Sequence, residues 1–352
     1  MGVVRASILR VVRTTVSAVV CAAALTACIR TSGPDPAPTV SPQEPDLRRG
    51  AVTAMVWSAD GWVYFYYGRL SEPGGLWRRP VDGSSALERV PVGPAADACP
   101  TGGFSALGEV SSGVLAAAAD CPDGSGGGGG GVVTTLDTGT GEHRRLVVLP
   151  EFSGTGLVVL PGLAGAYITA ADGHCQSLGL FDPRAGFRPL GHQVTVRDTV
   201  FWPDALFRAQ TARPACGKTG DGGWPALTGD GRTLYFVARA APANGSGQMA
   251  QAEAAVFRMP VDGATAASRV FDGFRSPRSL AVVVVDGRPA VAVCATVNGK
   301  VGVWLIRAED GTILRSWTGQ YRLLSPSLDR TRLIATKLAN DAEEAFELLD
   351  LD

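Results

Sequence analysis

From residue 51 onward, short apolar runs alternate with turn residues along the chain. The clearest example is Pro225–Val237, where a short apolar stretch leads to Asp230-Gly231 and then to a run of β-branched and aromatic residues. Glycine adopts positive φ without a steric penalty, so Asp-Gly suits a tight turn between two strands. The run that follows has the composition and length of a strand. This segment is therefore predicted to form a strand, a turn and a second strand.

The same unit recurs near both ends of this region. Residues 58–67 and 327–335 repeat the order of polar turn and apolar strand, and residues 76–83 are echoed by 256–263. The predicted strands fall into groups of about four, with three in the last: 52–92, 103–149, 156–190, 224–271, 279–317 and 323–351. Four-stranded units that repeat and stack on one another are typical of a β-propeller, so the sequence predicts an all-β propeller.

The predicted propeller has six blades of four antiparallel strands. Five or seven blades are alternatives, because residues 191–223 form a segment long enough to contain further strands. The last group is one strand short. We therefore expect an N-terminal strand from residues near Leu47–Val52 to complete the last blade.

The repeated unit resembles that of a known family. In the first and fourth groups, Ser/Thr-x-Asp-Gly precedes an aromatic strand, and a later apolar-Arg strand ends in Asp-Gly. This pattern resembles the TolB-type WD40-like (PD40) repeat, and the sixth group matches it in part. The resemblance implies a six-bladed propeller used as a binding platform, as in the periplasmic Tol–Pal component and many bacterial surface lipoproteins. It transfers no catalytic residue to this sequence.

The N-terminal residues have the pattern of an export signal. Arginines at positions 5, 10 and 13 precede the uncharged residues 14–27, which are fewer than the roughly 20 that a membrane-spanning helix needs. This segment ends in Leu25-Thr26-Ala27-Cys28, which resembles the bacterial lipobox. An ordinary signal peptide that happens to end next to a cysteine is the alternative.

The lipobox resemblance implies a lipid anchor. In lipoproteins the thiol equivalent to that of Cys28 receives a diacylglycerol and the preceding residues, here 1–27, are removed; two acyl chains give a stable anchor. Residues 28–50 are rich in proline and are predicted to be a semi-extended tether. The propeller domain is then expected to occupy residues 51–352.

The long connecting segments are predicted to open on one face of the propeller, at residues 68–75, 120–131, 191–223 and 240–255. Function usually lies on loops that a rigid scaffold carries, so we expect this long-loop face to contact a partner. Tolerated insertions are the alternative explanation of these lengths. The candidate residues for partner contact are Trp202, Trp224, His174 and His192.

The cysteines fit an exported domain, because disulfides form in oxidising compartments. We expect the pairs Cys99–Cys121 and Cys175–Cys216 on the long-loop face, with Cys294 buried in a strand. A thiolate metal site is the less favoured alternative, since the sequence has no C-x-x-C pair.

Composition and motifs argue against several classes of function. The 352 residues contain 32 Lys and Arg against 33 Asp and Glu, which argues against nucleic-acid binding. Residues 212–219 match a loose P-loop pattern, but no helix is expected to follow. Asp137-Thr138-Gly139 resembles an aspartic-protease triplet, but it occurs once. We therefore expect no catalytic residue, no cofactor and no metal.

These observations favour a monomeric, non-catalytic propeller that binds an envelope protein or a cell-wall glycan. Its lipid anchor would hold it on the outer face of the cytoplasmic membrane, or on the periplasmic side of an envelope membrane. The alternative is a propeller enzyme, either a glycoside hydrolase or a metal- or quinone-dependent oxidoreductase, with its site at the central channel.

Overall fold

The computed structural model of the chain describes residues 50–69, 72–84, 86–93, 103–120, 130–149, 153–171, 176–188, 193–197, 199–201, 221–240, 252–262, 265–340 and 343–352. Contacts between Cα atoms divide the chain into Met1–Gln43 and Glu44–Asp352, and every described residue belongs to the second unit. The predicted signal peptide, the lipobox with Cys28 and the tether up to residue 49 lie outside the described residues.

The all-β prediction is confirmed. Among the described residues, the regular structure consists of strands and one short 3₁₀ helix, η1 (Pro161–Leu163). Three antiparallel sheets come first. The first group is β1 (Ala51–Trp57), β2 (Trp62–Arg69), β3 (Glu72–Pro80) and β4 (Glu88–Arg89). The second group is β5 (Phe104–Ser111), β6 (Val114–Asp120), β7 (Gly131–Asp137) and β8 (His143–Leu149). The third group is β9 (Ser153–Val159), β10 (Ala166–Ala171), β11 (Gln176–Asp182) and β12 (Gly186–Arg188).

The next strands form a hairpin and a seven-stranded sheet. The hairpin is β13 (Val194–Val196) with β14 (Thr199–Phe201), inside the segment in which the sequence left room for further strands. The seven-stranded sheet is β15 (Asp221–Leu227), β16 (Thr233–Arg239), β17 (Glu253–Pro260), β18 (Ser268–Val285), β19 (Arg288–Val297), β20 (Lys300–Arg307) and β21 (Ile313–Thr318). The last sheet is β22 (Gln320–Pro326), β23 (Leu333–Asn340) and β24 (Glu343–Leu349).

The seven-stranded sheet contains two of the strand groups expected from the sequence. The first part of β18 pairs with β17, for example Arg269 with Phe257, whereas its second part pairs with β19, for example Ser279 with Cys294. The register shifts between Arg275 and Ser279, and Ser276 has a positive φ of 50°. We name β15–β17 with the first part of β18 the fourth group, the rest of β18 with β19–β21 the fifth group, and β22–β24 the sixth group.

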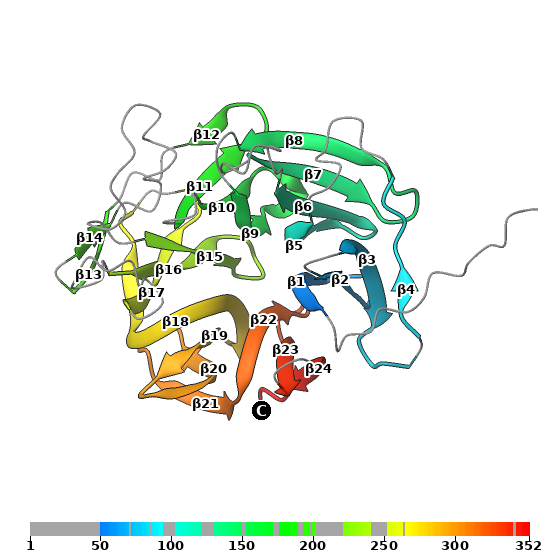
Figure 1. Cartoon of the computed structure of the whole chain (residues 1–352). Helices are drawn as coiled ribbons and strands as arrows, with labels where there is room; N and C mark the ends of the chain where they lie inside the picture. Colours follow the sequence, from blue (N-terminus) through cyan, green and yellow to red (C-terminus); the bar gives the residue numbers. More distant parts are fainter. Residues whose placement is uncertain are drawn as a thin grey trace, which may run out of the picture. The chain divides into compact units, whose positions relative to one another are not determined.

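The first strands of the groups contact one another in a cyclic order. β1 contacts β5, β5 contacts β9, β9 contacts β15, β15 contacts β18, β18 contacts β22, and β22 contacts β1 again. Figure 1 shows these strands converging on one central region, with the later strands of each group farther out. The curled sheets therefore place the same strand of each group at the centre.

Hydrophobic cores fill the spaces between neighbouring groups. Each of six clusters of buried side chains joins one group to the next, and one of them joins the sixth group back to the first. In that last cluster the rings of Phe65 and Phe346 lie 4.8 Å apart between centroids. A single sheet with two apolar faces would expose both of them to water. Stacking of neighbouring groups therefore buries most of this apolar surface.

Side-chain hydrogen bonds to the backbone also connect neighbouring groups. The Thr53 hydroxyl donates to the carbonyl of Phe104 at 2.7 Å, and the Tyr167 hydroxyl donates to the carbonyl of Val261 at 3.0 Å. These contacts fix the groups relative to one another in addition to their apolar packing.

Two expectations concern the ends of this region. Ala51 and Val52 lie in β1 of the first group, and among the described strands β24 pairs only with β23. Gly50 forms a bend before β1, and residues 47–49 of the segment expected to complete the last blade lie outside the described residues. Within the part of the chain that the structure describes, no helix has the length and apolarity needed to cross a bilayer.

Candidate functional site

The first turns of the groups lie at one end of the central strands, which we name the turn end. Three of these turns follow one plan. In each, the amide of the fourth residue donates to the carbonyl of the first: Gly61 to Ser58 at 3.1 Å, Gly231 to Thr228 at 2.9 Å, and Arg330 to Ser327 at 2.9 Å. The third residue is aspartate in each case. The repeated sequence thus builds the same turn in the first, fourth and sixth groups.

The aspartates hold these turns through their carboxylates. Asp60, Asp230 and Asp329 each accept a hydrogen bond from a backbone amide two residues later, at 3.1, 3.0 and 3.1 Å respectively. Such local acceptors stabilise turns. Hydrogen bonds from the hydroxyls of Thr228 and Ser327, together with these backbone bonds, hold the pKa values of Asp230 and Asp329 below the ordinary range.

Arg330 stands where the other two turns have glycine. The fourth residue has a positive φ in all three turns, 84° at Gly61, 66° at Gly231 and 63° at Arg330. For a residue with a Cβ atom this left-handed conformation costs roughly 1–2 kcal/mol. The sixth group therefore has a long cationic side chain at a position where the other two turns have glycine, which has no side chain.

A central cavity of about 480 Å³ opens among the first strands and their turns. Its apolar lining comes from all six groups. The first group contributes Met55, Val56 and Trp57, and the other five contribute Leu107, Leu157, Leu160, Leu227, Leu280 and Leu324. Its polar lining includes Glu109, Ser325, Ser327 and Arg330. Among the described lining residues, Arg330 is the only cation and Glu109 the only anion.

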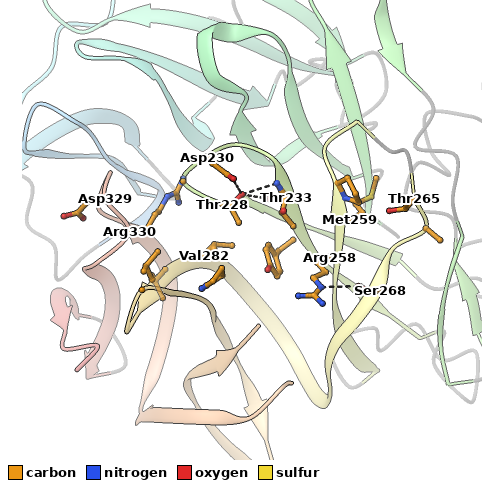
Figure 2. A pocket seen from close by; sticks show the side chains of 18 residues that line it. Thr228, Asp230, Thr233, Arg258, Met259, Thr265, Ser268, Val282, Asp329 and Arg330 are labelled. Carbon is orange, nitrogen blue, oxygen red and sulfur yellow. Dashed lines mark hydrogen bonds between the residues drawn. The ribbon is translucent and has the colours of Figure 1, made fainter. Parts of the chain in front are cut away.

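A side pocket of about 630 Å³ lies next to the central cavity, between the fourth and fifth groups. Figure 2 shows its walls, with Arg258 and Ser268 on one side and Arg330 and Asp329 on the other. The Nε of Arg258 donates to the Ser268 hydroxyl at 3.2 Å, and its Nη1 donates to the Ala308 carbonyl at 3.1 Å. Burial raises the pKa of Tyr235 at this wall, and Arg258 offsets part of that rise.

Arg330 lies on the wall shared by the two spaces, together with Thr228 and Gly229. A Cβ atom at Gly229 would lie 3.5 Å from the Cγ of Arg330, so the arginine stem packs over this glycine. The carbonyl of Arg330 accepts a hydrogen bond from the amide of Val284 at 2.7 Å, which ties the turn to the fifth group. Arg330 is therefore held by two contacts: its side-chain stem packs over Gly229 in the fourth group, and its carbonyl bonds to Val284 in the fifth group.

The guanidinium itself is poorly satisfied. Its Nε is buried without a hydrogen-bond partner, and no ion pair involves Arg330 among the described residues. Burial lowers the pKa of Arg330, and the charge of Glu109 partly opposes this. A buried polar donor without a partner costs free energy, more so when it is charged.

Glu109 has backbone and side-chain partners in the neighbouring turn. Its Oε1 accepts hydrogen bonds from the Ser58 hydroxyl and from the amide of Ala59, both at 2.7 Å. These bonds connect the first turn of the first group to β5 of the second group. The carboxylate is thereby fixed at the turn end of the cavity.

Three of the four residues predicted to contact a partner, Trp202, His174 and His192, lie outside the described residues. The four cysteines of the predicted disulfides, Cys99, Cys121, Cys175 and Cys216, also lie outside them. Trp224 is described: it is half-buried in β15, and the guanidinium of Arg239 lies 5.2 Å from its ring centroid. Cys294 is buried in β19 with a free thiol, as the sequence predicted, and burial raises the pKa of that thiol.

Sequence reasoning looked to the long loops and missed the turn end. The signal was present as Ser327-Leu328-Asp329-Arg330, where the first group has Ser58-Ala59-Asp60-Gly61. An arginine at the glycine position of a repeated turn marks a departure that the repeat alone does not explain.

The comparisons with known proteins concern the fold. A scan against protein-family models finds no match, and a search of curated proteins finds no relative. Among solved structures, TolB from Acinetobacter baumannii has a TM-score of 0.54 at 11% identity, with 83% of this chain and 61% of that chain covered. The chain thus spans less than two thirds of that protein.

Two further solved structures are similar to this chain. An oligogalacturonate lyase in complex with manganese has a TM-score of 0.50 at 11% identity, with 82% of this chain and 74% of that chain covered. Regucalcin, a calcium-binding protein from Agrobacterium tumefaciens, has a TM-score of 0.49 at 15% identity, with 85% and 89% covered. At these identities the first two likenesses show the fold alone, which is a TolB-like β-propeller.

Proposed function

We propose that this chain is a lipid-anchored, extracytoplasmic lipoprotein whose propeller is a non-catalytic binding platform for an envelope protein or a cell-wall glycan. The observation that carries the proposal is the cyclic contact of the six groups, with a hydrophobic core between each pair and one cavity at the centre. Such packing gives a rigid scaffold on which turns and loops present binding residues.

The six groups are proposed to be six blades. Ser276 divides β18 between the fourth and fifth blades, because the register shifts there and the strand changes its partner. The last blade has three described strands, and the N-terminal residues before Ala51 would supply the fourth. The short hairpin β13–β14 would then belong to a connection between the third and fourth blades.

The anchor is proposed from the N-terminal sequence. Leu25-Thr26-Ala27-Cys28 follows an uncharged segment at the position of a signal cleavage site, and the proline-rich residues 28–50 would hold the propeller away from the membrane. Replacing Cys28 with serine is expected to move the protein from the membrane fraction to the soluble fraction and to abolish labelling by a palmitate analogue. Unchanged labelling would contradict the anchor.

The platform role is tested by photo-crosslinking of the native protein in intact cells. One set of probes goes into residues 191–223 and 240–255, a second set at the turn end at Ala59 and Leu328, and a control probe at Asp310 on an outer turn. Capture of one envelope protein, or of cell-wall glycan, by only one of the first two sets supports the proposal and identifies the binding face. Equal capture by all probes, or none, contradicts it.

A further inference from the structure

The turn end contains a cation that the fold itself does not require. The turn of residues 327–330 has the same hydrogen bonds as those of residues 58–61 and 228–231, in which glycine occupies the fourth place. Arg330 adopts the same positive φ at a steric cost, and its Nε is buried without a partner. Two unfavourable features at one residue are the pattern expected of a binding site that is kept at the expense of stability.

The surroundings of Arg330 indicate which kind of hydrogen-bond acceptor could pair with its guanidinium. Its guanidinium is planar and presents several donors, which match the two oxygens of a carboxylate. The negative charge of Glu109 stabilises the charged form of Arg330, but Oε1 of Glu109 already accepts hydrogen bonds from Ser58 and Ala59. The free donors of Arg330 therefore lack an acceptor that the described chain supplies.

Charge balance favours a single negative charge on the ligand. The described wall of the central cavity has one cation and one anion, Arg330 and Glu109. A phosphate dianion would bring two negative charges next to Glu109 with only one guanidinium to compensate them. A carboxylate brings one charge and has the geometry to pair with the guanidinium in a bidentate manner.

The rest of the cavity favours an apolar body behind the charge. Leucines at 107, 157, 160, 227, 280 and 324 line the space of about 480 Å³. Pockets of this kind bind ligands through apolar contact area, while a few polar groups fix the orientation. The volume accommodates a small organic acid or the end of a peptide chain.

We propose that the central cavity binds the carboxylate of a ligand with an apolar body, and that Arg330 is the residue that pairs with it. The apolar body lies among the leucines and the carboxylate faces the wall that the cavity shares with the side pocket. This site goes beyond the platform role, because it assigns a small-ligand site at the turn end and holds whether or not an envelope partner is captured by the crosslinking probes.

The test measures binding of 4-(4-fluorophenyl)butyrate by fluorine NMR to the protein as cells produce it, placed in nanodiscs. The amide of the same acid is the neutral control, and empty nanodiscs give the background. We expect saturable binding of the acid and at least tenfold weaker binding of the amide. Equal binding of the two, or no binding of the acid above background, would overturn the proposal.

Three variants assign the site. Arg330→Gln keeps a side chain with a Cβ atom on the same turn and is expected to weaken binding of the acid at least tenfold. Glu109→Gln keeps an acceptor for Ser58 and Ala59 but removes the opposing charge, so it is expected to tighten binding severalfold. Arg269→Gln is the matched control, because Arg269 pairs with Asp272 on the exposed part of β18 away from the cavity.

The two variants are expected to change the affinity for the acid in opposite directions, which distinguishes a binding role of Arg330 from a structural one. A purely structural defect at the turn would not make Glu109→Gln bind the acid more tightly. If Arg330→Gln does not fold, the Glu109→Gln variant and the amide control decide the question. Unchanged affinity in a folded Arg330→Gln variant, or weaker binding by Glu109→Gln, contradicts the assignment.

The source of the ligand is distinguished by a second pair of probes. A short apolar peptide with a free C-terminal carboxylate is compared with the same peptide carrying a C-terminal amide. Displacement of the fluorinated acid by the free peptide alone indicates a peptide terminus as a ligand of the site. Displacement by neither peptide restricts the site to small organic acids.

Discussion

The carboxylate of Glu344 accepts a hydrogen bond from the backbone amide of Val52, across 292 positions in the sequence. Glu344 lies in β24, the last strand, and Val52 lies in β1, the first. Arg322 in β22 also pairs with this carboxylate, at 3.1 Å. A second bond joins the same two groups, from the amide of Trp57 to the Ser325 hydroxyl at 2.7 Å. Buried polar contacts thus connect the first and last groups near both ends of β1, at Val52 and at Trp57.

Glu344→Ala is expected to destabilise the fold by about 1–3 kcal/mol, because it leaves the buried amide of Val52 without an acceptor and Arg322 without its partner. Urea unfolding followed by tryptophan fluorescence measures the loss. The matched control is Glu347→Ala on the same strand. Its partly exposed contacts, with Lys337 and with the hydroxyl of Tyr321, are together expected to contribute about 1 kcal/mol. An equal loss in the two variants would contradict the closing role of Glu344.

The stability contributed by Glu344 is expected to depend on pH in a defined direction. Burial raises the pKa of Glu344 above its ordinary value of 4.5, although Val52 and Arg322 act in the opposite direction. The folded protein therefore holds this proton more tightly than the unfolded chain. The part of the stability that comes from this tighter proton binding is fully present below pH 4.5 and is lost as the pH rises through the folded-state pKa.

Glu344→Gln removes this titration while retaining an acceptor for Val52. Unfolding free energies of the wild type and of this variant are to be compared from pH 7.5 down to pH 4.5. The wild type is expected to gain stability relative to the variant as the pH falls. A relative loss on acidification would show that the ion pair with Arg322 outweighs desolvation.

The strand groups could be predicted from the sequence because each depends on local pattern. Turn residues such as Asp230-Gly231 interrupt apolar runs at regular intervals, and most of the resulting strands match the expected groups to within three residues. The hairpin β13–β14 lies outside these groups. The continuous strand β18 was not predicted. Its two parts pair with different neighbouring strands. Phe274 and Arg275 pair with both β17 and β19, and these two residues carry the strand across the expected gap.

The candidate site could be predicted only in part. Arg330 departs visibly from the glycine of the repeated turn, so the sequence marks that position. The role of Glu109 has no local signal, because its partners Ser58 and Ala59 lie in another group and meet it only when the groups pack. The cavity arises in the same way, from leucines that are unremarkable in their own strands.

A pair of glycine substitutions tests the close packing of the turn end. Gly61→Ala meets no atom within 4 Å, so it is expected to cost only the left-handed backbone strain, about 1 kcal/mol. A Cβ atom at Gly231 would lie 2.7 Å from the Cγ of Pro161, so Gly231→Ala is expected to cost about 1–3 kcal/mol more. Urea unfolding of both variants measures the difference. Equal losses would show that the fourth turn does not pack against η1.

Arg330→Gly is expected to give a protein that is more stable than Arg330→Gln. Both changes remove the buried guanidinium, but only glycine relieves the strain at a φ of 63°. That relief is worth roughly 1–2 kcal/mol, and the greater freedom of glycine in the unfolded chain offsets about 0.4–1 kcal/mol of it. A net gain of about 1 kcal/mol in unfolding free energy, with the fluorinated acid bound by neither variant, is the expected result. If the glutamine variant were as stable as the glycine variant, the turn would be free of strain and Arg330 would need no ligand to explain its place.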